Sequence, residues 1–213
     1  MKRRYIAVMV LLGYASWAYF RPPTSTTISV RIGQRFDDVV NGSTFPVVAA
    51  SKVPNNPSGS GATWVKEPAV VIQFNDPRYG FTLPATTFAV IGYMNGKVDD
   101  ISTSPMLSKV SFGQAVTTLD RLQRQFQARG WQPEFGTTWF DLTPRGRELL
   151  REQVRSISNG FMKTTMLVVP GKYEMIFRLW CAAECDSRIG WDRYLIDIGI
   201  SADVGFELKD KPP

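Results

Sequence analysis

The chain of 213 residues contains no histidine and only two cysteines. Without histidine there is no His-based general acid or base, no Ser–His or Cys–His nucleophile pair, and no His-ligated metal site. Two cysteines are too few for a Cys-rich zinc or iron–sulfur site. The sequence therefore predicts neither a metal site nor a bound cofactor.

Familiar catalytic motifs are absent as well. Gly59-Ser60-Gly61 lacks the Lys-Ser/Thr pair of a phosphate-binding loop. The chain has no G-x-S-x-G elbow and no S-x-x-K pair. Among the carboxylates, Asp197 is unusual because it interrupts an apolar strand pattern; we expect it to face solvent beside Arg178 or Arg193. A glycosidase-type acid pair drawn from distant positions stays open.

The excess of basic residues is concentrated at one end of the chain. The formal net charge is +6, and Lys2, Arg3, Arg4 and Arg21 all precede the first proline. Without these four, 21 basic residues face 19 acidic ones. So small an excess does not form the concentrated basic surface that nucleic acids require, and we predict no nucleic-acid binding.

The first 21 residues are typical of an export signal or a membrane anchor. Lys2, Arg3 and Arg4 precede residues 5–20, which carry no charge. A basic start followed by an apolar run places the start in the cytoplasm and the body beyond the membrane. We favour a retained anchor in the inner membrane with the body in the periplasm. A cleaved signal peptide, with Ser16 and Ala18 at the cleavage site, is the alternative, and a buried helix in a cytoplasmic protein is a third reading.

We divide the remaining chain into a tether at residues 22–27, a single extracytoplasmic domain at residues 28–205, and a polar tail at residues 206–213. Residues 51–63 are rich in Ser, Gly, Pro and Asn and are predicted to be a loop. Alternating or continuous apolar patterns predict strands. The predicted strands cover residues 28–32, 69–74, 87–94, 97–102, 164–169, 173–181 and 194–200. Asn95-Gly96 predicts a type I′ hairpin turn.

Two amphipathic helices are predicted between the strands. Ser111 and Gln114 form a capping-box pattern before an apolar stripe that ends near Gly130. The second helix begins at Thr143-Pro144, with Leu150, Val154 and Ile157 inward. A short helix is expected over residues 35–41. The fold class is therefore α+β: an antiparallel sheet of about six strands with two amphipathic helices packed on one face.

Cys181 and Cys185 are predicted to form a structural disulfide. Their spacing is not the Cys-x-x-Cys pattern of a redox motif, and an exported body would lie in an oxidising compartment. Free thiols or a catalytic pair are the alternatives. The bridge closes a short loop, so its stabilising effect is smaller than that of a long-range bridge.

The candidate partner-binding residues are aromatic and basic. Tryptophans anchor protein partners or fill cores, and arginines four residues apart share one helix face. The candidates are Trp131, Trp139, Trp180, Trp191, Arg147, Arg151 and Arg155. Glu148 and Glu152, which are interleaved with the arginines, favour an ordinary solvated face instead.

Three functions are compatible with these observations. We favour a non-enzymatic, membrane-anchored binding protein with a protein partner in the cell envelope, such as an immunity or inhibitor protein for a toxin or hydrolase. The first alternative is a structural or assembly component of an envelope complex, such as a secretion system. The second is a hydrolase of envelope glycans that uses carboxylates, with Asp197 as the first candidate.

Overall fold

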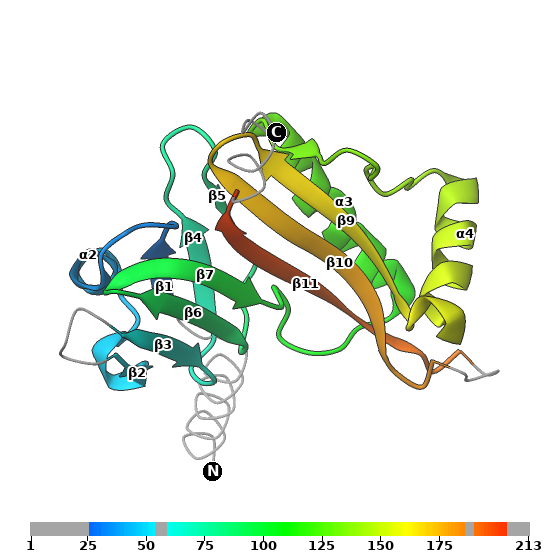
Figure 1. The fold of residues 1–213 in the computed structure, drawn as a ribbon. Helices are drawn as coiled ribbons and strands as arrows, with labels where there is room; N and C mark the ends of the chain where they lie inside the picture. Colours follow the sequence, from blue (N-terminus) through cyan, green and yellow to red (C-terminus); the bar gives the residue numbers. More distant parts are fainter. Residues whose placement is uncertain (1–25, 54–58, 186–189, 204–213) are drawn as a thin grey trace, which may run out of the picture.

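The computed structural model describes residues 26–53, 59–185 and 190–203. It confirms the α+β class, and its strands form two sheets (Figure 1). The larger sheet has eight strands, two more than we predicted. The predicted membrane segment at residues 5–20 and the predicted tail at 206–213 lie outside the described residues. Within the described ranges, none of the helices has the length and apolar character needed to cross a membrane.

The eight-stranded sheet is antiparallel throughout. Its short strands β2 and β8 lie at the two edges, and β7 and β11 meet at its centre. In spatial order the strands are β2 (Ser51–Lys52), β3 (Ser60–Val65), β6 (Ala89–Met94), β7 (Lys97–Thr103), β11 (Arg193–Ala202), β10 (Tyr173–Ala183), β9 (Met162–Val169) and β8 (Gln132–Pro133).

The smaller sheet differs from the prediction because one of its pairings is parallel. It consists of β1 (Thr26–Val30), β4 (Val70–Phe74) and β5 (Phe81–Thr82), and β1 pairs with β4 in parallel. A parallel pair needs a long crossover, which the chain provides between Val30 and Val70. β1 begins at Thr26, inside the range that we assigned to the tether.

Part of the predicted loop at residues 51–63 is strand. Residues 51–52 form β2, and β3 begins at Ser60, while residues 54–58 lie outside the described part. Small polar residues favour coil locally, but here the ladder with β6 fixes them, and Thr63 is fully buried. The prediction of a continuous loop was therefore wrong for these residues.

Local signals in the sequence located the helices well. The helices are α2 (Phe36–Gly42), α3 (Phe112–Ala128) and α4 (Pro144–Arg155). Ser111 and Gln114 form the predicted capping box, and the Thr143 side chain caps α4 by accepting from the Gly146 N–H. The Asn95–Gly96 turn has positive φ at both residues, as predicted.

One inward prediction failed at the end of α4. Leu150 and Val154 are buried, but Ile157 is 80% exposed. The helix stops at Arg155, and Ile157 begins the 3-10 turn η2 (Ile157–Asn159), so the helical spacing no longer directs its side chain. A second 3-10 turn, η1 (Val48–Ala50), precedes β2.

The hydrophobic core is continuous and rich in aromatic rings. α3 lies behind the long strands β9, β10 and β11 (Figure 1). α4 lies beside the end of these strands that is farther from the smaller sheet. Phe126 of α3 packs edge to face against Phe177 of β10 and also against Phe81 of β5. These contacts join the two sheets and α3 into one core. On the opposite face of β9, β10 and β11, no helix of the described residues covers the strands.

Candidate functional site

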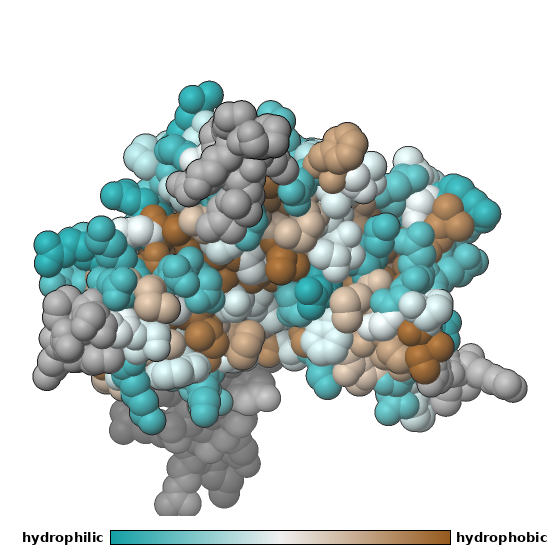
Figure 2. Space-filling model, in the orientation of Figure 1, coloured by the Kyte–Doolittle hydropathy of each residue, from teal (hydrophilic) through white to brown (hydrophobic). Residues whose placement is uncertain are grey.

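The strands β10 and β11 present two different faces because side chains alternate along a strand. On β10 the residues Met175, Phe177 and Leu179 are buried against the helices. Ile176, Arg178 and Trp180 point to the opposite face, which is only partly covered. Figure 2 shows the same side of the molecule, with apolar patches among polar ones over the long strands.

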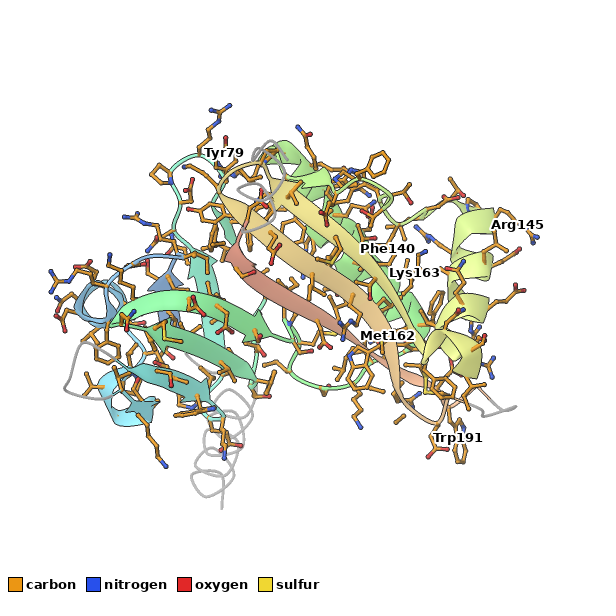
Figure 3. All side chains as sticks on the ribbon, in the orientation of Figure 1. Tyr79, Phe140, Arg145, Met162, Lys163 and Trp191 are labelled. Atoms are coloured by element: carbon orange, nitrogen blue, oxygen red, sulfur yellow. A yellow bond between two sulfur atoms is a disulfide. The ribbon has the colours of Figure 1, made fainter. Side chains whose placement is uncertain are left out.

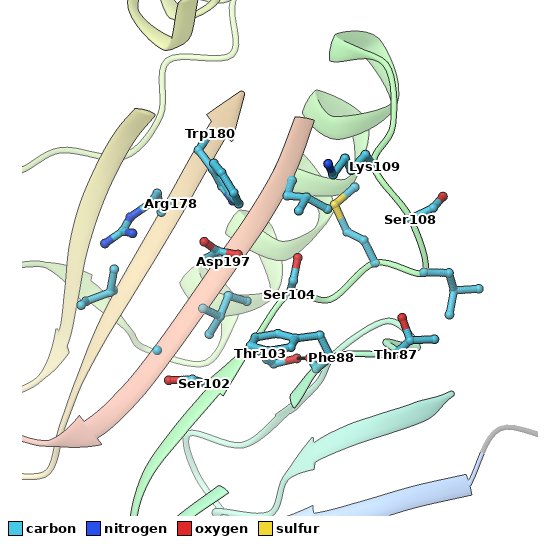
Figure 4. A pocket seen from close by; sticks show the side chains of 16 residues that line it. Thr87, Phe88, Ser102, Thr103, Ser104, Ser108, Lys109, Arg178, Trp180 and Asp197 are labelled. Carbon is cyan, nitrogen blue, oxygen red and sulfur yellow. Dashed lines mark hydrogen bonds between the residues drawn. The ribbon is translucent and has the colours of Figure 1, made fainter. Parts of the chain in front are cut away.

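A hollow of about 570 Å³ lies on this open face. Its floor is β10 and β11, and its rim is formed by the end of β7, the segment that follows it, and Phe88 (Figure 4). Phe88 is 53% exposed and Leu107 55% exposed, so both offer apolar surface at the rim. The lining residues are Thr87, Phe88, Ser102, Thr103, Ser104, Met106, Leu107, Ser108, Lys109, Ile176, Arg178, Trp180, Leu195, Asp197, Ile198 and Gly199.

Gly199 leaves open space in the floor of the pocket. It pairs across the sheet with Ile176 on one side and Ser102 on the other. A Cβ added at Gly199 would meet only the Ile176 Cβ, at 3.8 Å, which is an ordinary contact. An added Cβ therefore fits here without displacing the backbone, and it would point into the pocket.

Asp197 is the acidic residue of the pocket. It pairs across the strands with Arg178, one of the two neighbours we predicted. The Arg178 Nε, however, donates to the Thr164 hydroxyl on β9, 3.3 Å away, and its guanidinium points away from Asp197 (Figure 4). Within the described ranges, Asp197 makes no ion pair.

The surroundings of Asp197 act on its pKa in two directions. Burial disfavours the charged form and raises the pKa, while Trp180, Arg178 and Ser104 lower it by a smaller amount, so the pKa lies above its ordinary value. The Trp180 Nε1 contributes to this lowering but lies outside hydrogen-bond geometry. It is a buried donor without a hydrogen-bond partner.

The four candidate tryptophans do not gather at one site. Trp131 is 2% exposed and its Nε1 donates to the Tyr79 carbonyl, so its ring belongs to the core. Trp139 packs against the core from its edge. Trp191 is 63% exposed and lies near the end of α4 (Figure 3). Trp180 alone among the four lines the pocket.

The three candidate arginines hold α4 in place. Arg147 Nε donates to the Leu142 carbonyl at 2.7 Å, and Arg155 Nε donates to the Cys185 carbonyl at 3.3 Å. Arg151 pairs with the buried Asp192 at 3.3 Å. Each of these groups thus has a partner within the chain, and none lines the pocket on the open face.

Cys185 forms the predicted disulfide with Cys181. The bridge lies at the end of the β10–β11 hairpin, where Arg155 also attaches α4. Asp192, just before β11, accepts hydrogen bonds from the Tyr194 hydroxyl and from Arg151. Arg151 and Arg155 of α4 bond Asp192 and the Cys185 carbonyl, so they attach α4 to the hairpin end that the disulfide closes.

Sequence reasoning missed most of the pocket. Phe88, Met106, Leu107 and Ile176 are ordinary apolar residues in the sequence, and the chain brings them together only in the fold. Asp197 and Trp180 were singled out in the sequence, and Gly199 offers a further local signal, because a glycine inside a strand often marks a close approach of a ligand or another backbone. The described residues contain no group of three or more His, Cys, Asp or Glu side chains placed to hold a metal ion.

Comparison with protein-family models, with curated proteins and with solved structures finds no match for this chain.

Proposed function

We propose that this protein is a non-enzymatic binding protein, held at the membrane, that contacts a protein partner in the cell envelope through the open face of β10 and β11. The observation that carries the proposal is the pocket of about 570 Å³ on that face. Its volume is in the range of small-ligand sites, and its rim carries exposed Phe88 and Leu107. Exposed apolar residues around a hollow are typical of partner binding.

The proposed compartment rests on two independent features. A basic triplet precedes the uncharged residues 5–20, which is the pattern of an exported or anchored chain. The only two cysteines of the sequence form a disulfide, which persists in oxidising compartments. A toxin or hydrolase of that compartment is the kind of partner that we propose, with this protein as its inhibitor.

The pocket gives less support to a glycan hydrolase. Such enzymes use two carboxyl groups, about 5 to 9.5 Å apart, on either side of the scissile bond. Asp197 is the one acidic residue among those that line the pocket. A two-carboxylate mechanism would therefore lack its second group at this site.

A comparison of pocket variants tests the proposal. The full chain would serve as bait in an envelope extract from its native source, beside the variants G199V and S201V. The valine side chain introduced by G199V would project into the pocket from its floor, while Ser201 lies on the same face of β11 outside the lining and bonds Glu174. We expect a stoichiometric partner that the unchanged chain and S201V retain and G199V loses. Equal retention by all three would contradict the proposal.

A further inference from the structure

We propose that the pocket receives a lysine or arginine side chain of the protein partner, with its aliphatic part against Ile176 and Leu195 and its cationic head at Asp197. This inference rests on the proposed function and names the chemistry that the pocket recognises. Long basic side chains combine an apolar stem with a charged end. The lining combines apolar side chains with one carboxylate, Asp197, and two cations, Arg178 and Lys109.

Charge complementarity favours a cation at Asp197. The carboxylate is half-buried and has no ion pair within the described residues. A partly buried charge that lacks an ion pair is costly, and an incoming cation offsets that cost. Arg178 does not fill this role, because it is directed to Thr164 on β9. Lys109, the other cation of the lining, is exposed on the segment after β7.

Two hydroxyl groups among the lining residues are buried and bonded within the chain. Thr103 Oγ1 donates to the Phe88 carbonyl at 2.8 Å, and Ser104 Oγ donates to the Ile196 carbonyl at 2.8 Å. Each hydroxyl has one hydrogen to donate, and these two are already used within the chain. Thr103 is 2% exposed and Ser104 6% exposed, so Asp197 is the acceptor that an incoming cation would meet.

The experiment uses short peptides as probes and the Trp180 indole as reporter. The full chain, labelled with ¹⁵N at tryptophan and kept in mild detergent, would be titrated with acetyl-Leu-Arg-Leu-amide. A matched peptide has citrulline, the uncharged isostere, in place of arginine. We expect a saturable shift of the Trp180 indole N–H signal, assigned with W180F, and binding of the citrulline peptide about tenfold weaker or more.

Two variants test the charge of Asp197 and the open space at Gly199 separately. D197N removes the charge and keeps the shape, so we expect it to bind the arginine and citrulline peptides equally. G199V is expected to bind neither peptide, and S201V to bind both as the unchanged chain does. Equal affinity of the unchanged chain for both peptides would overturn the inference and leave the proposed function standing.

A different result would show that both ideas fail. If neither peptide shifts the Trp180 signal, and G199V also retains every partner found in the envelope extract, then the pocket is not a binding site. If neither peptide shifts the signal but G199V loses a partner, the proposed function holds, and the ligand chemistry inferred here is overturned.

Discussion

Two buried aspartates accept a tyrosine hydroxyl, and the remaining contacts of each carboxylate differ. Asp76 accepts from Tyr173 at 2.8 Å and from two backbone N–H groups, those of Arg78 and Tyr79. Asp192 accepts from Tyr194 and Arg151, both on the same oxygen, and its other oxygen is buried without a partner. Asp192 therefore depends more heavily on its tyrosine.

The first prediction compares the same Tyr→Phe change at these two aspartate sites. Y194F removes a donor from a carboxylate that has few, and we expect it to lower the free energy of unfolding by about 2 kcal/mol. Y173F leaves Asp76 with its two backbone donors, and we expect a loss of about 1 kcal/mol. Urea unfolding at pH 7 measures both values. A larger loss for Y173F than for Y194F would contradict this account.

A second prediction concerns the stability cost of the pocket carboxylate. Burial raises the pKa of Asp197, so its charged form favours the unfolded chain. The cost is present at a pH above the folded pKa and disappears below the ordinary value of 3.8. D197N should therefore raise the free energy of unfolding at pH 7, with no gain near pH 3. Urea unfolding at both pH values tests this, and a loss at pH 7 would show that Asp197 has a stabilising partner.

At the scale of elements, two helix glycines look alike in sequence and differ in their surroundings. A Cβ at Gly146 in α4 would lie 2.4 Å from the Asp141 carbonyl oxygen and 2.2 Å from its Cγ. A Cβ at Gly113 in α3 would meet nothing within 4 Å. Helix propensity alone favours alanine at both positions.

The third prediction follows from this difference. G113A should stabilise the protein by up to about 1 kcal/mol, because alanine restricts the unfolded chain and fits the helix. G146A should destabilise it by about 1 to 3 kcal/mol, because the start of α4 must move away from Asp141. Thermal unfolding followed by far-ultraviolet circular dichroism measures both. Stabilisation by G146A would show that the Asp141 segment moves freely.

The elements that sequence predicted correctly are those with a local cause. Ser111 and Thr143 cap their helices through their own side chains, and Asn95-Gly96 makes its turn with its own backbone. Two features that depend on distant partners were missed. The strand at Ser60–Val65 exists because it pairs with β6. The parallel pairing of β1 with β4 depends on a long crossover, which no short pattern in either strand announces.

For the whole molecule, the buried carboxylates predict sensitivity to acid. Burial opposes their ionisation, but hydrogen bonds and nearby cations outweigh it and lower the pKa of both Asp76 and Asp192. Groups with a lowered folded pKa stabilise the protein above the unfolded value of 3.8, and this stabilisation is lost as the pH falls through the folded pKa.

The fourth prediction is therefore a loss of stability below about pH 4. The free energy of unfolding, measured with urea between pH 7 and pH 2, should fall steeply in this range. In D76N the fall should be smaller, because one of the titrating groups is gone, although the variant is less stable at pH 7. A profile as steep as that of the unchanged chain would assign the acid sensitivity to other carboxylates.

The pocket itself is a property of the whole fold, which explains why the sequence revealed only fragments of it. Asp197 and Trp180 attracted attention as separate residues. Phe88 lies just before β6, Leu107 comes from the segment after β7, and Gly199 comes from the last strand, so their proximity depends on the order of strands in the sheet. That order is not encoded in any short stretch of the chain.

The junction between β7 and β11 has a consequence for how the chain is made. β7 pairs with β6 as soon as its hairpin forms, but its other edge pairs with Ile198–Ser201, near the end of the sequence. During synthesis the chain emerges from its N-terminus, so this edge stays open until β11 has been made. An open strand edge invites pairing with other chains. A chaperone that binds the first half of the nascent protein, or rapid synthesis of the chain up to β11, would keep it from aggregating.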